Sequence, residues 1–329
     1  MNSRDIKVSN TNTIDNSVGK FNKRKGSASM FPRTDLNILS WNINGVGSKF
    51  LDSLDPHNPT SDSSEKLVQF LREYDLVCMQ ETFFTDTEMM YHKLGPVVRK
   101  YDVFHSLRTR KHKKAKRGSG GVVLLFKKQI KKGIFLVNNK HEDFLWVKLC
   151  KEYFGFEHDI YLGCVYLPPD KGKRDRYEEI LEKAVAEYSS LGKVLLIGDM
   201  NARIGNRQDF VQGDHCDYIP VPEAYDIDYC EKRQSLDTVV NPAGEILLQL
   251  CKSSGLRILN GRYADDQPGK FTCHKCNGTS VVDYFIAHHS LISYISSFKV
   301  TELQELYSDH APLTASLACR YDLNNTKIS

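Results

Sequence analysis

The sequence predicts a layered α/β fold in one domain, with polar side chains gathered at one edge of a sheet. Two observations lead to this. Short apolar runs typical of buried strands, such as Val194-Leu195-Leu196-Ile197, are interspersed with helical patterns such as residues 174–188. Several of the apolar runs end abruptly in Asp, Asn, Glu or Tyr. In layered α/β proteins, polar groups at strand ends meet at one rim, which is where sites form.

The most informative stretch is Gly198-Asp199-Met200-Asn201, directly after the run at 194–197. Residues two apart point to the same side of extended backbone, so Asp199 and Asn201 are expected to face one site. Met200 is expected to pack inward, and Gly198 to allow close backbone approach. Taken alone, the four residues favour an Asx-turn that only satisfies backbone groups. The other strand ends reverse that preference.

Polar residues recur at the ends of other expected strands, which span 36–41, 76–79, 160–166, 280–286 and 313–318. The full set is Asn42, Asn44, Glu81, Tyr166, Asp199, Asn201, Asp283, Asp309 and His310. Singly, Glu81 is better explained as a solvated loop residue, and Tyr166 equally well as a packed ring. The recurrence favours a shared site.

This set consists of hard oxygen ligands, one tyrosine and one histidine. Carboxylate and amide oxygens suit Mg²⁺ or Mn²⁺, and a neighbouring acid can orient an imidazole. We identify no nucleophile elbow, Gly-rich nucleotide loop or Schiff-base lysine in the sequence. The pattern fits metal-assisted attack of water on a phosphate ester. We therefore expect Mg²⁺ or Mn²⁺ and no small-molecule cofactor.

Length and composition favour a single large domain between polar tails. The chain has 329 residues, of which 40% are hydrophobic, and a net charge of +4. We expect a disordered polar and basic tail at 1–33, a catalytic domain at 34–320 and a short tail at 321–329. Without an 18-residue apolar run or a signal-peptide core, no membrane partner is expected. The nine cysteines suit reduced thiols in a nuclear or cytoplasmic protein, which we expect to be a monomer.

A basic segment spans residues 108–117, in which seven of ten residues are Lys or Arg. These are Arg108, Arg110, Lys111, Lys113, Lys114, Lys116 and Arg117. Such a run repels itself, so it is expected to form an exposed loop. Two roles remain open: contact with the phosphates of duplex DNA, and a solubilising or nuclear-import function.

The motifs, in this order, resemble the endonuclease/exonuclease/phosphatase superfamily. The series is Ser40-Trp41-Asn42-Ile43-Asn44-Gly45, Gln80-Glu81-Thr82, Gly198-Asp199-Met200-Asn201-Ala202-Arg203, Val282-Asp283-Tyr284-Phe285 and Ser308-Asp309-His310. Within the superfamily, the chain resembles the apurinic-endonuclease-like domains of non-LTR retrotransposons. The resemblance covers roughly residues 36–319. It implies a four-layer α/β sandwich: two packed mixed β-sheets flanked by helices.

The resemblance also implies metal ligands. Glu81 is expected to be the main one, with Asn42 or Asn44 and Asp309 nearby. Repair apurinic endonucleases carry Asp where this chain has Asn44, whereas retrotransposon enzymes commonly carry Asn. The lower negative charge is expected to weaken metal binding.

Catalytic roles follow from the same resemblance. Asp199 is expected to orient or deprotonate the attacking water, and Asn201 and Tyr166 to donate to the phosphate. His310 is expected to bind or polarise the scissile phosphate, held in orientation by Asp283. A carboxylate beside an imidazole fixes its tautomer and raises its pKa, which agrees with this assignment.

The implied function is a metal-dependent endonuclease that nicks duplex DNA. Two alternatives remain: a phosphatase or RNase of the same fold, and a non-catalytic DNA-binding relic. The basic segment favours DNA, and the intact candidate residues favour an enzyme. The hairpin at 273–276 carries no aromatic clamp, so specificity for abasic sites is not expected.

The hairpin does carry Cys273-x-x-Cys276, which invites a zinc site completed by Cys216, Cys230 or His215. Zinc sites usually pair two such motifs, and only one is present. A zinc site of this kind is therefore not expected.

Overall fold

The computed structural model describes residues 34–46, 62–108, 119–211 and 231–320. Both expected tails lie outside the described residues, as do His215, Cys216 and Cys230. Of the basic segment, only Arg108 is described. Among the described helices, none combines the length and apolar character needed to cross a membrane.

The first sheet has six strands in the order β13-β14-β1-β2-β4-β3. Their bounds are β1 (Thr34–Asn42), β2 (Leu76–Gln80), β3 (Tyr101–Ser106), β4 (Val122–Lys127), β13 (Ile295–Val300) and β14 (Leu313–Cys319). β1 and β2 run parallel, and β14 runs antiparallel to β1. The sequence did not predict β3 and β13, which are the two edge strands. Polar residues interrupt both, as is common at sheet edges.

The second sheet also has six strands, in the order β5-β6-β7-β8-β12-β9. Their bounds are β5 (Ile134–Asn138), β6 (Phe144–Leu149), β7 (Ile160–Tyr166), β8 (Lys193–Asp199), β9 (Leu256–Ile258) and β12 (Asp283–His288). β6 and β7 pair antiparallel. β7 and β8 pair parallel, whereas β12 runs antiparallel to β8.

The single strand expected at 280–286 is wrong, because these residues belong to two strands in different sheets, β11 (Gly278–Ser280) and β12. β11 pairs only with β10 (Cys273–Lys275), across the expected Asn277-Gly278 turn. The chain then leaves the hairpin: Val281 N–H donates to Asp237 Oδ2 at 3.0 Å, and Asp283 N–H donates to Thr272 Oγ1 at 3.1 Å. β12 therefore begins at Asp283 instead of continuing the hairpin.

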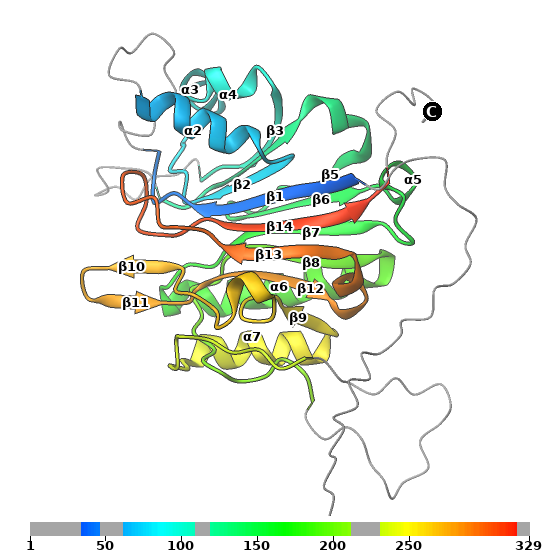
Figure 1. The fold of residues 1–329 in the computed structure, drawn as a ribbon, viewed down its shortest axis with the longest axis vertical. Coiled ribbons are helices and arrows are strands. Elements are labelled where there is room, and N and C mark those ends of the chain that lie inside the picture. The colour runs from blue at the N-terminus through cyan, green and yellow to red at the C-terminus, as the bar shows by residue number, and fades with distance from the viewer. Residues whose placement is uncertain (1–33, 47–61, 109–118, 212–230, 321–329) are drawn as a thin grey trace, which may run out of the picture. The chain divides into compact units, whose positions relative to one another are not determined.

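Helices cover the outer face of each sheet (Figure 1). α2 (Asp62–Arg72), α3 (Thr87–Lys93) and α4 (Gly95–Val98) pack on the first sheet, and α6 (Lys171–Leu191) and α7 (Pro242–Ser253) on the second. Asp170 and Asn241 cap α6 and α7 by accepting from Gly172 N–H and Gly244 N–H, each at 2.8 Å. A short helix, α5 (Lys151–Phe154), follows β6.

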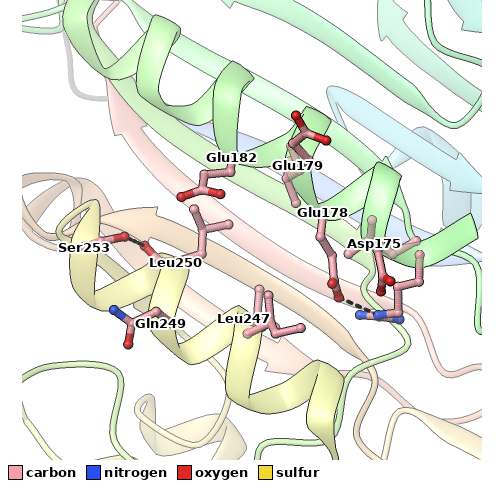
Figure 2. A pocket seen from close by; sticks show the side chains of 12 residues that line it. Asp175, Glu178, Glu179, Glu182, Leu247, Gln249, Leu250 and Ser253 are labelled. Carbon is pink, nitrogen blue, oxygen red and sulfur yellow. Dashed lines mark hydrogen bonds and ion pairs between the residues drawn. The ribbon is translucent and has the colours of Figure 1, made fainter. Parts of the chain in front are cut away.

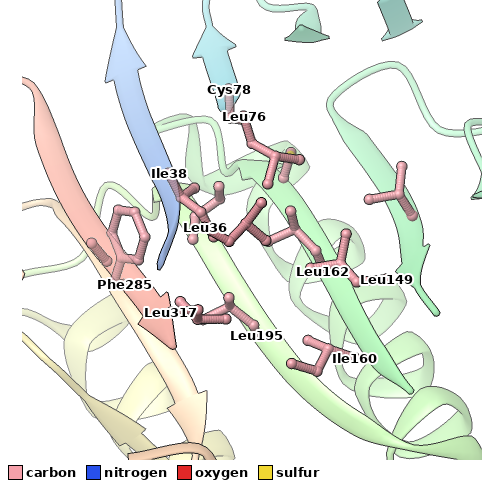
Figure 3. Packing of buried hydrophobic residues seen from close by; sticks show 14 of the residues in the cluster. Leu36, Ile38, Leu76, Cys78, Leu149, Ile160, Leu162, Leu195, Phe285 and Leu317 are labelled. Atoms are coloured by element: carbon pink, nitrogen blue, oxygen red, sulfur yellow. The ribbon is translucent and has the colours of Figure 1, made fainter. Parts of the chain in front are cut away.

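The largest apolar cluster lies between the two sheets. Side chains of the first sheet, such as Leu36 and Leu317, meet those of the second, such as Leu162 and Leu195, as Figure 3 shows. All four are fully buried. Burial of this area is the main force that fixes one sheet on the other. The order of layers is helix, sheet, sheet, helix, so the predicted four-layer α/β sandwich is confirmed.

Candidate active site

Strand direction brings the polar strand ends of both sheets to one rim. The parallel pairs β1–β2 and β7–β8 end there, because parallel strands share their carboxyl edge. β12 runs antiparallel to β8, so it begins at this rim, with Asp283 paired opposite Asp199. The segment before β14 arrives there for the same reason. Gly198, with φ +136°, permits the close packing that was expected, since a Cβ would lie 2.0 Å from Val165 O.

Asn42 connects the two sheets at this rim. Its Nδ2 donates to Glu81 Oε1 at 2.9 Å and to Asp199 Oδ2 at 2.8 Å. Its Oδ1 accepts from Asn44 N–H at 2.9 Å, and Asn44 Nδ2 donates to Asp309 Oδ1 at 3.0 Å. The four residues predicted as metal ligands therefore form one hydrogen-bonded chain that also reaches Asp199.

Asp199 is buried within a ring of donors. Its Oδ1 accepts from Asn201 N–H at 2.8 Å, and its Oδ2 from Asn201 Nδ2 at 3.0 Å. Burial and the charges of Asp283 and Glu81 raise its pKa to about 8, although nearby His310 opposes the shift. The two side chains thus face one site, as predicted, while Met200 between them is fully buried. A carboxyl group that titrates near neutral pH suits proton transfer.

His310 is held by a carboxylate and by its own backbone. Its Nδ1 lies 2.8 Å from Asp283 Oδ2, and its backbone N–H donates to Ser308 Oγ at 3.0 Å. Trp41 Nε1 donates to its carbonyl at 2.8 Å. Burial lowers the pKa of His310, but the charge and hydrogen bond of Asp283 outweigh it and raise the pKa to about 12. The raised pKa favours the charged imidazole with an N–H at both ring nitrogens, and the ring also hydrogen-bonds the Cys273 side chain.

Tyr166, the last residue of β7, is buried close to the same carboxylates. Burial, together with the charges of Glu81 and Asp199, raises the pKa of its hydroxyl far above the usual range. The hydroxyl therefore stays protonated at neutral pH. It can donate a hydrogen bond to an anion without adding charge.

Three candidate residues adopt unusual backbone angles. Asn44, Glu81 and Asn201 have φ of 44°, 49° and 44°; the other positive-φ non-glycine residue in the described segments is Phe83. Left-handed backbone costs energy outside glycine and tends to cluster at functional sites. Here the surrounding hydrogen bonds impose it, since Asn44 and Asn201 each donate both a backbone and a side-chain N–H within the site.

Sequence reasoning missed Arg174, which supports the Asp199–Asn201 turn from behind. Its Nη2 donates to Met200 O at 2.8 Å and its Nη1 to Asn201 O at 3.1 Å, while Nε contacts Glu178 Oε1 at 2.6 Å. Arg174 lies on α6 and also lines a groove of about 430 Å³ between α6 and α7. Figure 2 shows that acidic side chains, among them Asp175 and Glu182, edge this groove. Its negative charge makes it a poor surface for DNA.

Lys275 was also missed, because nothing in the local sequence connects the hairpin to the site. Residues 273 and 275 lie on the same face of β10, and Lys275 is exposed. Partial burial lowers the pKa of Lys275, but the Cys273 thiol and the carboxylates of Asp309, Asp199 and Glu81 raise it overall. An ammonium group therefore lies close to the acidic cluster.

Arg108, the described residue of the basic segment, contacts the protein's own acids. Its guanidinium pairs with Asp143, and its Nε lies 3.1 Å from Glu142 Oε2. The guanidinium of Arg108 is therefore largely engaged by these two acidic side chains. A contact of Arg108 with DNA stays a prediction, as does one for the six basic residues at 110–117.

Comparison with solved structures supports the fold. AP endonuclease LMAP from Leishmania major has a TM-score of 0.60 at 15% identity, with 88% of each chain covered. The 3′ phosphatase NExo from Neisseria, bound to product DNA hairpin, has a TM-score of 0.54 at 14% sequence identity, with 86% of this chain and 99% of that chain covered. The endonuclease domain of TRAS1, a telomere-specific non-LTR retrotransposon, has a TM-score of 0.53 at 14% sequence identity, with 86% of this chain and 98% of that chain covered.

No curated protein matched the chain. The profile of the Endonuclease/Exonuclease/phosphatase family matches residues 39–310. This span covers most of the chain and runs from the strand before Asn42 to His310, so it contains the whole rim described above. The chain therefore belongs to the Endonuclease/Exonuclease/phosphatase family.

Proposed function

We propose that this protein is a metal-dependent endonuclease that nicks duplex DNA by attack of water on a phosphodiester. The observation that carries the proposal is the network in which Asn42 joins Glu81 to Asp199, beside the His310–Asp283 pair. The network of Asn42, Glu81 and Asp199 supplies oxygen ligands and a proton acceptor. The His310–Asp283 pair supplies a positively charged side chain for the phosphate.

The donor set fits a divalent cation. Glu81, Asp309 and the amide oxygens of Asn42 and Asn44 are the hard ligands that Mg²⁺ or Mn²⁺ prefers. Charge crowding also favours a cation here, because neighbouring carboxylates help to raise the pKa of Asp199. A bound cation would neutralise charge on the phosphate oxygens.

Each of the protein's own residues at the site then has a separate role. Asp199 is placed to take the proton of the attacking water, since its orientation is fixed by Asn42 and Asn201. The Nε2–H of His310 and the hydroxyl of Tyr166 are placed to donate to the phosphate as its charge grows. Asp283 keeps the imidazole charged and aligned.

DNA is favoured over the alternative substrates on two grounds. The Neisseria relative of this fold was solved with a DNA hairpin, and the basic segment at 108–117 suits a polyanion. A phosphatase or RNase of the same fold would use the same catalytic groups. We propose a monomer in the nucleus or cytoplasm, and the free cysteines of the described residues are in keeping with a reducing compartment.

The test is nicking of supercoiled plasmid with Mg²⁺, with and without EDTA. Asp199→Ala and His310→Ala should each lower the rate by about 10²–10⁴, the usual contribution of an acid–base group. Glu187→Ala, which removes an exposed carboxylate on α6, is the matched control. Wild-type rates in either site variant would refute the mechanism. Faster cleavage of RNA or of a soluble phosphomonoester than of plasmid would refute the substrate.

A further inference from the structure

At the edge of the site, a cysteine thiol that the Mg²⁺ chemistry does not use lies beside two residues of the site, Asp309 and His310. The ligand atoms of Cys273, Asp309 and His310 all lie within 4.8 Å of one another. Cys273 comes from β10, whereas the other two precede β14. Backbone pairing holds these segments together: His274 N–H donates to Asp309 O at 2.7 Å, and Cys273 forms a bridge with His310.

The imidazole presents the correct nitrogen to this set. Its Nδ1 is engaged by Asp283 Oδ2 at 2.8 Å, whereas its Nε2 faces Asp309 Oδ1 at 4.0 Å. A carboxylate on one imidazole nitrogen orients the other one toward a metal in many protein sites. Asp283 would therefore serve as the orienting partner without being a ligand.

The chemistry of the donors selects zinc over magnesium. Zn²⁺ takes thiolate, imidazole and carboxylate ligands in a tetrahedron, at about 2.0–2.3 Å. Ligand atoms of such a tetrahedron lie about 3.5 Å apart, so side-chain rotations would bring these three atoms into range. Mg²⁺ prefers an octahedron of oxygens and has little affinity for sulfur. Cys276, the other cysteine of the hairpin, is exposed and is not part of the set.

We propose that Cys273, His310 and Asp309 form an inhibitory zinc site. Binding releases two protons to solvent, one from the Cys273 thiol and one from Nε2 of the charged His310 ring, and leaves a fourth position for water. It occupies His310 Nε2, which the scissile phosphate requires, and it removes Asp309 from the magnesium ligands. The inhibitory consequence rests on the proposed nuclease function, whereas the binding itself does not.

Binding is tested on the full chain with Co²⁺ alone as the probe, because a thiolate–cobalt bond gives a charge-transfer band in the near ultraviolet. The band should appear in the wild type and in Cys276→Ser, and should be absent from Cys273→Ser. Zinc should displace the cobalt, and Asp309→Asn should weaken zinc affinity by about tenfold or more. A wild type without the band, or a Cys273→Ser variant that keeps it, would overturn the proposal. Circular dichroism of each variant checks the fold.

Inhibition is tested in the plasmid assay at fixed Mg²⁺ with increasing zinc. Wild type and Cys276→Ser should become inactive at the same zinc concentration, while Cys273→Ser should resist a concentration at least tenfold higher. Equal sensitivity of all three would show that inhibition does not pass through Cys273. If no nicking occurs even without zinc, the nuclease assignment fails, but the cobalt band still decides whether the metal site exists.

Discussion

At the residue scale, one amide sets the electrostatics of the site. Asn42 Nδ2 donates to both Glu81 and Asp199, so one neutral donor links two carboxylates, and Asn201 donates to Asp199 as well. Burial, together with the negative charges of Asp283 and Glu81, raises the pKa of Asp199 to about 8. The positive charge of His310 opposes part of this shift. A cation beside Glu81 would balance the rest.

Glu81→Gln tests that balance. The change keeps size and one oxygen but removes an anionic ligand, so the Mg²⁺ concentration for half-maximal nicking should rise about tenfold or more. Activity at saturating Mg²⁺ should recover in large part. The measurement is a Mg²⁺ titration of plasmid nicking. An unchanged Mg²⁺ titration would mean that Glu81 is not a metal ligand.

Lys275→Ala tests the exposed ammonium group near the acidic cluster. If Lys275 contacts the substrate phosphate, its removal should lower kcat/KM by about 10–100-fold, as expected for a hydrogen bond to a charged group. Thr279→Ala, which alters an exposed residue on the paired strand β11, should have no effect. Steady-state kinetics on a short duplex gives the comparison. Equal kcat/KM values for the two variants would mean that Lys275 does not contact the substrate phosphate.

At the element scale, helix α6 supports the Asp199–Asn201 turn, which follows the end of β8. The turn combines the positive φ of Gly198 with that of Asn201, a conformation that needs support. Arg174 provides it from the first turn of α6, through hydrogen bonds to the carbonyls of Met200 and Asn201. α6 therefore positions the catalytic turn in addition to covering the sheet.

Arg174→Lys should separate positioning from charge. Lysine keeps the positive charge but cannot make the two parallel donations, so the turn should loosen. We expect kcat to fall about 10–100-fold, the effect of a misplacement near 1 Å, while KM and the Mg²⁺ titration stay the same. Arg176→Lys, on the exposed face of α6, is the matched control. A fall in thermal stability with an unchanged kcat would indicate a structural role only.

At the scale of the whole molecule, the site exists only because two sheets pack face to face. Asn42 ends β1 and Glu81 directly follows β2 of the first sheet, whereas Asp199 and Asp283 belong to the second. Their contacts depend on the apolar cluster between the sheets. Long-range recognition of DNA must come from surface charge, and the net charge of +4 is mild. The basic segment concentrates that charge.

The basic segment is tested by replacing Lys113, Lys114, Lys116 and Arg117 with Ser. If these side chains neutralise phosphates, the slope of log K against log salt should flatten by about 0.9 for each phosphate that is no longer neutralised. The effect should be equal on a fixed and a scrambled duplex. Hydrolysis of a small phosphodiester should not change, because such a substrate does not extend beyond the site. An unaltered slope would instead favour a solubilising or import role.

By itself, the sequence determined the interior strands and the candidate site residues. Runs such as 194–197 are apolar without interruption, and a buried strand is the simplest way to shelter them. Strand periodicity correctly predicted that Asp199 and Asn201 face one site, although Asn201 lies beyond the end of β8, and a left-handed turn with hydrogen bonds to Asp199 brings the two side chains together. The edge strands β3 and β13 escaped prediction because one side of an edge strand lacks a partner and tolerates polar residues.

The tertiary structure decided which of these residues meet. Asn42 and Asp199 are 157 positions apart in the chain, and no local rule brings their side chains to 2.8 Å. Packing of the two sheets does so. Other long-range contacts broke the expected strand at 280–286, placed Lys275 and Cys273 beside the site and set Arg174 behind the catalytic turn. These contacts depend on long-range burial and hydrogen bonding, which sequence periodicity does not encode.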